Sequence, residues 1–157
     1  MPIVEGHLTA KGRRFGIVAA RTNDLVVSRL LDGALDALRR TGADEADVVV
    51  VRTPGAWEIP LALRDLSRAQ GFDAFVALGA VLRGGTPHFE YIAGEVTKGV
   101  FAVSLEIDRP VAFGVLTCDT LEQALERAGA KGGNKGFEAA LAAVESADLR
   151  ARLTTRS

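Results

Sequence analysis

Apolar runs alternate with segments of helical periodicity along this chain, and turn-forming residues mark each change. Four runs are rich in Val, Ala, Leu and Phe and are short enough to be buried strands; they span residues 15–20, 48–51, 72–82 and 110–117. The segment after the first run places these apolar residues on one face of a helix: Val27, Leu30, Leu31, Ala34, Leu35 and Leu38. The alternation predicts βαβ units, and therefore an α/β fold in which helices cover both faces of an open, four-stranded parallel sheet.

Capping residues set the expected helix boundaries. Asn23 or Asp24 is expected to cap the first helix and Gly42 to end it, whereas Pro60 suits the first turn of a second helix that runs to residues 70–71. No linker or internal repeat interrupts the series of elements. The pattern therefore predicts a single domain.

The same signals mark the later helices. Thr86 is expected to cap a third helix and Pro87 to start it. The apolar face of that helix carries Phe89, Ile92, Val96, Val100 and Val103. Asp119 and Glu122 have the spacing of a capping box for a short fourth helix, and a final helix is expected over about 134–149.

Composition narrows the class of protein. The chain has 157 residues, enough for one core, and its 48% hydrophobic and 25% charged residues exclude disorder, collagen and coiled coil. With 19 basic and 20 acidic side chains the net charge is -1, so no broad attraction to nucleic acid or to an anionic membrane is expected. Binding must come from a local site.

Cysteine usage and the start of the chain bear on its compartment. Cys118 is a single cysteine without an adjacent base, so we expect a small buried residue rather than a nucleophile or a disulfide partner. No Cys/His cluster has metal-ligand spacing, no leader pattern precedes the first strand, and no apolar stretch is long enough to span a membrane. These observations favour a cytoplasmic protein without a metal site.

Ligands of open parallel sheets bind beyond the carboxyl ends of the strands, here the loops 21–24, 53–58, 83–88 and 117–120. In the third loop Gly84 and Gly85 let the backbone approach an anion at a helix start, although the lysine and spacing of a nucleoside triphosphate loop are missing. His88 can exchange protons near neutral pH. From these residues alone, a plain turn and a surface histidine remain open.

Two further features also allow a structural and a functional interpretation. Trp57 and Glu58 follow a rigid turn at a strand end, where they could contact a ligand or simply pack and start a helix. Arg127, Lys131 and Lys135 form a basic corner that could neutralise a phosphate, or could serve as helix-end cations.

Four segments, taken together and in this order along the chain, decide between these interpretations. They are PGAWEIP at 54–60, LGAVLRGGTPHFEY at 78–91, FGVLT at 113–117 and GGNKG at 132–136. Together they resemble the 6,7-dimethyl-8-ribityllumazine synthase family over about residues 15–149. The resemblance implies a flavodoxin-like αβα sandwich in one domain over 1–157, with a core over 11–150, an inter-subunit strand over 1–10 and a tail over 151–157. It also implies a cofactor-free transferase of riboflavin biosynthesis, which condenses 5-amino-6-(D-ribitylamino)uracil with 3,4-dihydroxy-2-butanone 4-phosphate and releases phosphate and water.

The resemblance assigns roles residue by residue. His88 matches the acid/base histidine, and Gly85, Thr86 and Arg127 match the phosphate contacts. The expected contacts to the pyrimidine and ribityl chain are Thr22, Ala56, Trp57, Glu58, Ala80, Val81, Leu82 and, from a neighbouring subunit, Phe113. Asn23, Lys131 and Lys135 are further candidates near the site.

Thr22 departs from the family pattern, which has an aromatic residue that stacks on the pyrimidine between Arg and Asn. Loss of stacking costs on the order of 0.5–1.5 kcal/mol, which weakens binding but spares the chemistry. A catalytically weak ligand-binding or shell-forming paralogue is therefore the alternative to the enzyme. A flavodoxin-like electron carrier is a third hypothesis, which requires a bound flavin.

Assembly is the last property that the resemblance implies. Family members form pentamers, and some join pentamers into an icosahedral shell. The compact corner 129–136 and the leading segment 2–8 resemble those of shell builders, so we expect a shell, with an isolated pentamer as the alternative. The resemblance also indicates riboflavin synthase as a partner, and no nucleic acid or membrane.

Overall fold

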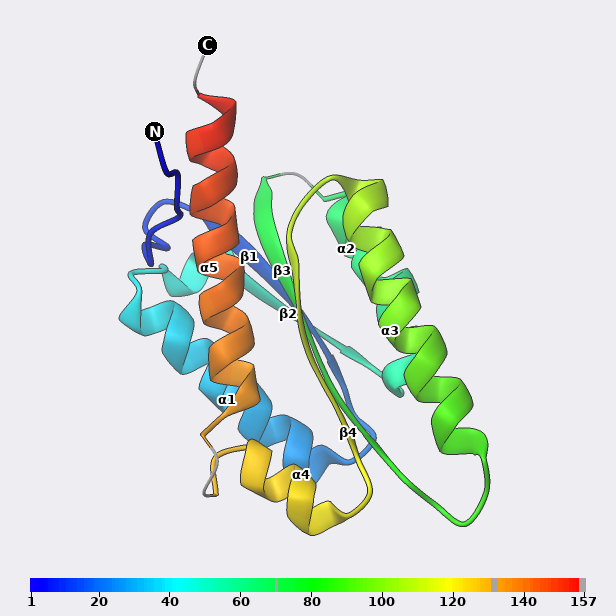
Figure 1. Ribbon diagram of the computed structural model, residues 1–157. Coiled ribbons are helices and arrows are strands. Elements are labelled where there is room, and N and C mark those ends of the chain that lie inside the picture. Colours follow the sequence, from blue (N-terminus) through cyan, green and yellow to red (C-terminus); the bar gives the residue numbers. More distant parts are fainter. Residues whose placement is uncertain (70, 131–132, 156–157) are drawn as a thin grey trace.

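A parallel sheet forms the centre of the molecule, as the computed structural model shows for residues 1–69, 71–130 and 133–155 (Figure 1). The strands pair in the order β2-β1-β3-β4, and every pair is parallel. Their bounds are β1 Arg14–Ala20, β2 Val48–Thr53, β3 Phe72–Leu82 and β4 Val111–Cys118. The predicted α/β fold class and sheet are confirmed, and β3 has the predicted bounds.

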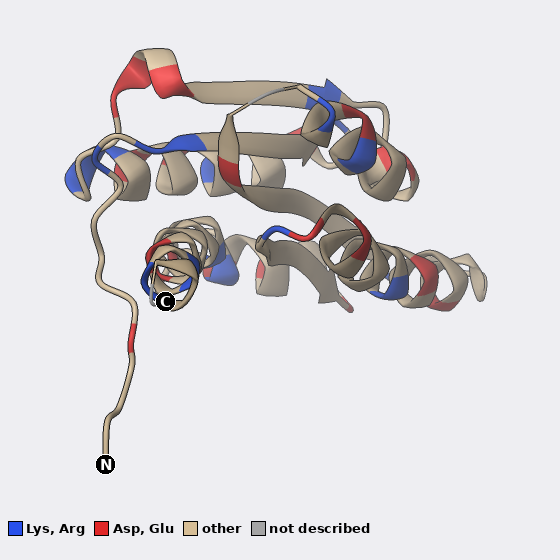
Figure 2. Cartoon of the chain, turned by 90° about the horizontal axis from the view of Figure 1, so that it is seen from above, with Lys and Arg blue, Asp and Glu red and all other residues tan. Residues whose placement is uncertain are grey.

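Helices form the two outer layers (Figure 1). Helices α1, α4 and α5 cover one face of the sheet, and α2 and α3 cover the other. Their bounds are α1 Asp24–Arg40, α2 Ile59–Ser67, α3 His88–Ile107, α4 Leu121–Arg127 and α5 Lys135–Thr154, with single 3-10 turns at Glu45–Asp47 and Ala56–Glu58. The charged residues lie mainly on these layers, and the strands between them are mostly uncharged (Figure 2).

Two hydrophobic cores lie between the layers because successive residues of a strand point to opposite faces. On β1, Phe15, Ile17 and Ala19 pack against the α1 and α5 side, whereas Val18 and Ala20 pack against the α2 and α3 side. Both sets are fully buried or nearly so. A central strand that is buried on both faces explains why its sequence is a continuous apolar run.

Several capping residues differ from the sequence-based expectation. Asn23 occupies the cap position of α1, but its φ of 62° is left-handed and its side chain makes no cap hydrogen bond. Thr86 does not cap α3, which begins at His88 after Pro87. The capping box of α4 pairs Thr120 with Gln123, so the expectation of Asp119 and Glu122 was wrong by one position.

Helix lengths also differ at two ends. Helix α2 ends at Ser67, before the predicted residues 70–71, whereas α5 continues beyond Leu149 to Thr154. Helices α1 and α5 cross closely at Gly136, where a Cβ would collide with the carbonyl of Leu30. No helix in the described ranges is both long and apolar enough to cross a membrane.

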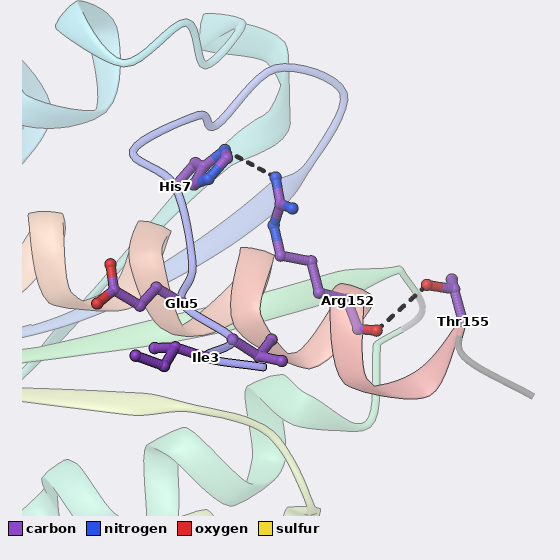
Figure 3. Close-up of a pocket in the computed structure, with 6 residues that line it drawn as sticks. Ile3, Glu5, His7, Arg152 and Thr155 are labelled. Atoms are coloured by element: carbon purple, nitrogen blue, oxygen red, sulfur yellow. Dashed lines mark hydrogen bonds between the residues drawn. The ribbon is translucent and has the colours of Figure 1, made fainter. Parts of the chain in front are cut away.

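The leading segment is extended; it passes beside α5 and then runs away from the body of the molecule (Figures 2 and 3). The buried carboxylate of Asp148 accepts hydrogen bonds from the His7 main-chain N–H at 2.6 Å and from Arg13 at 2.8 Å. Arg152 donates to Asp148 at 2.7 Å and contacts Nδ1 of His7 at 2.7 Å. These contacts hold the segment at His7, while Ile3 lies 74% exposed. Pairing of this segment with a neighbouring subunit stays a prediction.

Candidate active site

The chain passes from β1 to β2 on one side of the sheet and from β3 to β4 on the other, so the direction of the strand order changes between β1 and β3. Ligands of doubly wound folds bind at such a point. A cavity of about 270 Å³ opens there, and we call it the β1–β3 cavity. It is lined by Thr22, Asn23, Gly55, Ala56, Trp57, Ala80, Val81, Leu82, His88 and Ile92. The loops after β1, β2 and β3 therefore converge as the sequence predicted.

Hydrogen bonds between loops fix the walls of the β1–β3 cavity. The side-chain amide of Asn23 donates to the carbonyl of Ala80 at 2.8 Å, and the Thr22 hydroxyl donates to the carbonyl of Pro54 at 2.8 Å. The left-handed backbone of Asn23 turns the chain from β1 into α1 so that this amide reaches β3. Three strands are thereby connected around one cavity.

Trp57 and Glu58 take different positions at the end of β2. Trp57 lines the cavity and is 56% exposed, so its ring is available to a ligand. One carboxylate oxygen of Glu58 accepts the main-chain N–H of Gly55 at 2.8 Å, which closes the 3-10 turn before α2. The structural interpretation of Glu58 therefore holds, and ligand binding by this carboxylate is a separate proposal.

The loop from β3 to α3 is open to solvent. Gly84, Gly85, Thr86, Pro87 and His88 are all exposed. A Cβ added at either glycine would meet nothing within 4 Å, so space for a ligand exists beside this backbone. Because α3 begins at His88, its free N–H groups face the same region as the histidine.

A second cavity, of about 280 Å³, lies along β4, and we call it the β4 cavity. It is lined by residues 113–118 of the strand, by Arg127 at the end of α4 and by Lys135 at the start of α5. Arg127 Nη1 lies 3.4 Å from the sulfur of Cys118 and 3.5 Å from the carbonyl of Gln123. Phe113 is 43% exposed and Lys135 pairs with Glu138 at 3.4 Å.

The two cavities share no lining residue, so the candidate residues form two groups. Within one chain, Thr22, His88 and the β3 residues belong to the β1–β3 cavity, whereas Phe113, Arg127 and Lys135 belong to the β4 cavity. Gly85 and Thr86 lie on the open loop, and Lys131 lies outside the described residues.

Several lining residues were not among the predicted contacts: Ile92 and Gly55 in the β1–β3 cavity, and residues 114–118 in the β4 cavity. Ile92 lies four residues after His88 and so shares its side of α3, a spacing that could have identified it. Cys118 lines the β4 cavity and is buried, as its expected structural role requires. The part of the chain that the structure describes contains no group of three or more His, Cys, Asp or Glu that could hold a metal.

Comparisons with known proteins agree on one family. The family model described as 6,7-dimethyl-8-ribityllumazine synthase matches residues 12–151. The chain is 57% identical over 149 residues to a 6,7-dimethyl-8-ribityllumazine synthase of Aquifex aeolicus (strain VF5), which covers 95% of this chain and 97% of that protein. Proteins of the same name from Syntrophus aciditrophicus (strain SB) and Anaeromyxobacter sp. (strain Fw109-5) are 58% and 60% identical over 95% of this chain, and 97% and 91% of theirs.

Proposed function

The chain belongs to the 6,7-dimethyl-8-ribityllumazine synthase family, and from this premise we propose how its residues perform the condensation. The activity is that of a transferase that joins 5-amino-6-(D-ribitylamino)uracil to 3,4-dihydroxy-2-butanone 4-phosphate. The observation that carries this function is 57–60% identity to lumazine synthases over 95% of the chain.

His88 acts as the acid/base group of this reaction. The pyrimidine amine attacks the ketone carbonyl, and water leaves to form an imine. Phosphate is then eliminated, and the ring closes when the ribitylamino nitrogen attacks the remaining carbonyl and a second water leaves. Each stage moves protons but needs no protein nucleophile, which suits an imidazole at the edge of the β1–β3 cavity. Holding both substrates in one geometry supplies the rest of the acceleration.

The phosphate of the ketone binds at the start of α3. The main-chain N–H groups of Gly85 and Thr86 donate to its oxygens, and the open space beside the loop supports this placement. Arg127 supplies the opposing positive charge. Lys135 is a further cation that lines the β4 cavity, and Lys131 is a further candidate on its place in the sequence alone.

The pyrimidine and ribityl chain occupy the β1–β3 cavity. Ala80, Val81 and Leu82 form the apolar wall for the ring, while Ala56, Trp57 and Glu58 hold the ribityl chain at the end of β2. Thr22 and Asn23 close the side formed by the loop after β1. Phe113 approaches the ring from a neighbouring subunit.

A complete site therefore needs two copies of the chain. The main support is that the His88 group and the group of Phe113 and Arg127 line separate cavities within one chain. In a ring of subunits the β4 cavity of one copy can face the β1–β3 cavity of the next. We propose a homopentamer, further assembled into an icosahedral shell.

Several associated properties follow from the same proposal. Residues 1–10 pair as a strand with a neighbour, and residues 11–150 form the core of one domain over 1–157. The predicted tail begins at residue 151, although α5 continues to Thr154. The protein acts in the cytoplasm without a cofactor, and riboflavin synthase is its protein partner.

Thr22 favours a second candidate function, a weakly catalytic ligand-binding or shell-forming paralogue, because an aromatic stacking partner is missing there. His88, Arg127 and Glu58 are retained, which supports the enzyme. The test mixes the purified protein with both substrates and follows the absorbance and fluorescence of the product. Formation of product well above the uncatalysed rate supports the enzyme, and a rate equal to that of buffer refutes it.

A further inference from the structure

Arg83 lies between the two halves of the candidate site. It is the first residue after β3, and its main-chain N–H donates to the carbonyl of Cys118 at 3.0 Å, which continues the pairing of β3 with β4. The sheet therefore fixes its backbone, although the glycines that follow are open to solvent. A long cationic side chain thus starts from a rigid point beside a loosely packed loop.

The guanidinium of Arg83 contacts three side chains, two from α3 and one from the loop between β4 and α4. Its Nε donates to Oδ1 of Asp119 at 2.7 Å, at the junction of β4 and α4. Its Nη1 lies 3.5 Å from Oε1 of Glu90, and its central carbon lies 4.6 Å from the ring centroid of Phe89. Phe89 and Glu90 belong to the first turn of α3, and Asp119 directly follows the edge strand β4. Arg83 therefore connects the start of α3 to the end of β4.

Apart from Arg83, the start of α3 is held by packing, because Phe89 and Ile92 lie against the hydrophobic core on the α2 and α3 side of the sheet. In the described ranges, no side chain from 84 to 88 makes a hydrogen bond, and the bond from the Glu90 N–H to the Pro87 carbonyl is local. The first fully buried residue of α3 is Val96. Within the described residues, the ion pair from Arg83 to Glu90 therefore adds a polar side-chain restraint to this packing, close to His88.

The contacts continue from Arg83 toward the other half of the site. The Asp119 main-chain N–H donates to the side chain of Gln123 at 2.9 Å, and Arg127 Nη1 lies 3.5 Å from the Gln123 carbonyl. The guanidinium of an arginine is always charged in proteins, and the hydrogen bond to Asp119 raises the pKa of Arg83 further above its usual range. One cation thus joins the start of α3 to the corner that carries Arg127.

We propose that Arg83 is a positioning residue for the condensation: it fixes the first turn of α3, and with it His88 and the phosphate-binding loop. The inference rests on the proposed function of that loop. It assigns Arg83 no contact with substrate. A displacement of about 1 Å in a reacting geometry can slow an enzyme by roughly 10²-fold, so a bridge of this kind is expected to matter for turnover.

The first test is Arg83→Gln, which keeps a polar side chain but removes the charge and the fork of donors. We expect kcat to fall roughly 10-fold and KM for the phosphorylated ketone to rise several-fold, with KM for the pyrimidine within about twofold of wild type. Arg83→Lys keeps the charge and should recover part of the loss. The matched control is Arg39→Gln, an exposed arginine that pairs with Asp36 on α1, which should change nothing.

A double-mutant cycle tests whether Asp119 is the partner through which Arg83 acts. Asp119→Asn should reproduce part of the Arg83→Gln defect, and the two substitutions together should be no worse than Arg83→Gln alone, because residues in one network are not additive. Full additivity would overturn the coupling. Equal rises in both KM values, together with a lower melting temperature, would reduce Arg83 to a purely structural residue and overturn the proposal.

Amide hydrogen exchange supplies a measurement that does not depend on activity. In the assembled protein, Arg83→Gln should speed exchange at residues 88–91 and leave α1 unchanged. Unchanged exchange together with wild-type kinetics would overturn the inference while leaving the proposed function intact. If wild type itself forms no product, the proposed function fails, and exchange alone decides whether Arg83 fixes the start of α3.

Discussion

Thr22 lines the β1–β3 cavity with a small side chain whose hydroxyl donates to the Pro54 carbonyl. Thr22→Phe should add a surface for ring stacking and tighten pyrimidine binding by up to about 1 kcal/mol. Titration with a non-reacting pyrimidine analogue measures this, and Thr22→Val, which has the shape but neither ring nor hydroxyl, is the control. Weaker binding by the Phe variant would mean that this loop does not face the ring.

Arg127 is exposed, and its guanidinium lies beside Cys118 in the β4 cavity. Arg127→Ala should raise KM for the phosphorylated ketone roughly 10-fold or more and change KM for the pyrimidine far less, because hydrogen bonds to charged groups are strong. Inorganic phosphate should compete with the ketone in wild type. The control is Arg68→Ala, at the end of α2. Equal effects of Arg127→Ala on both substrates would remove Arg127 from the phosphate site.

At this scale the sequence predicted that the loops after β1, β2 and β3 meet, but not how they are held. The lining of the β1–β3 cavity was predictable because the carboxyl ends of parallel strands share one edge of a sheet. The hydrogen bond from Asn23 to Ala80 was not, because it depends on a left-handed residue and on a partner from β3. The sequence also did not show that Cys118 lines the β4 cavity, because Cys118 and Arg127 lie side by side only once the chain has folded.

Asp148 on α5 attaches the leading segment to that helix. Three donors, from Arg152, His7 and Arg13, hold the pKa of its carboxyl far below the ordinary value. Such a group stabilises the fold above its unfolded pKa of about 4, and this contribution is lost as the pH falls through that value toward the folded pKa. Acidification should therefore release the leading segment from α5.

Hydrogen exchange of the His7 amide measures this release, because that amide donates to Asp148. Exchange should be slow at about pH 5 and much faster at about pH 3 after correction for the intrinsic rate, and Asp148→Asn should exchange fast at both. Asp36→Asn, which alters an exposed pair on α1, is the control. Equal protection in wild type and Asp148→Asn would contradict this account of the attachment.

The strands were predicted more accurately than the helix ends. A strand that is buried on both faces is a continuous apolar run, so its bounds are visible in the sequence, as β3 shows. A helix cap is harder to predict because several neighbouring polar residues can occupy the cap position. At the start of α4, Thr120 and Gln123 form the capping box that was expected of Asp119 and Glu122. Helix α5 extends past Leu149 because its last turns bind the leading segment, a contact between opposite ends of the chain.

The whole molecule leaves large apolar residues exposed on a single copy, including Phe101, Leu105 and Phe113. A second copy would cover them, as the proposed pentamer requires. Electron microscopy and native mass measurement at micromolar concentration and neutral pH should show an icosahedral shell. Pentamers alone under these conditions would rule out the shell and leave the shared site intact.

The central claim is that each site joins His88 of one subunit to Arg127 of the next. His88→Ala should slow the condensation roughly 10²-fold or more, and Arg127→Ala should be slow at low ketone concentration. The deciding measurement is turnover of assemblies that contain both variants in equal amounts, made by co-expression, with each variant alone as the control.

In a ring with shared sites, about a quarter of the sites in such mixed assemblies would have both wild-type residues, so turnover should recover to about a quarter of wild type. Turnover no higher than the mean of the two separate variants would contradict the account, because it would place both residues in a site formed by one chain.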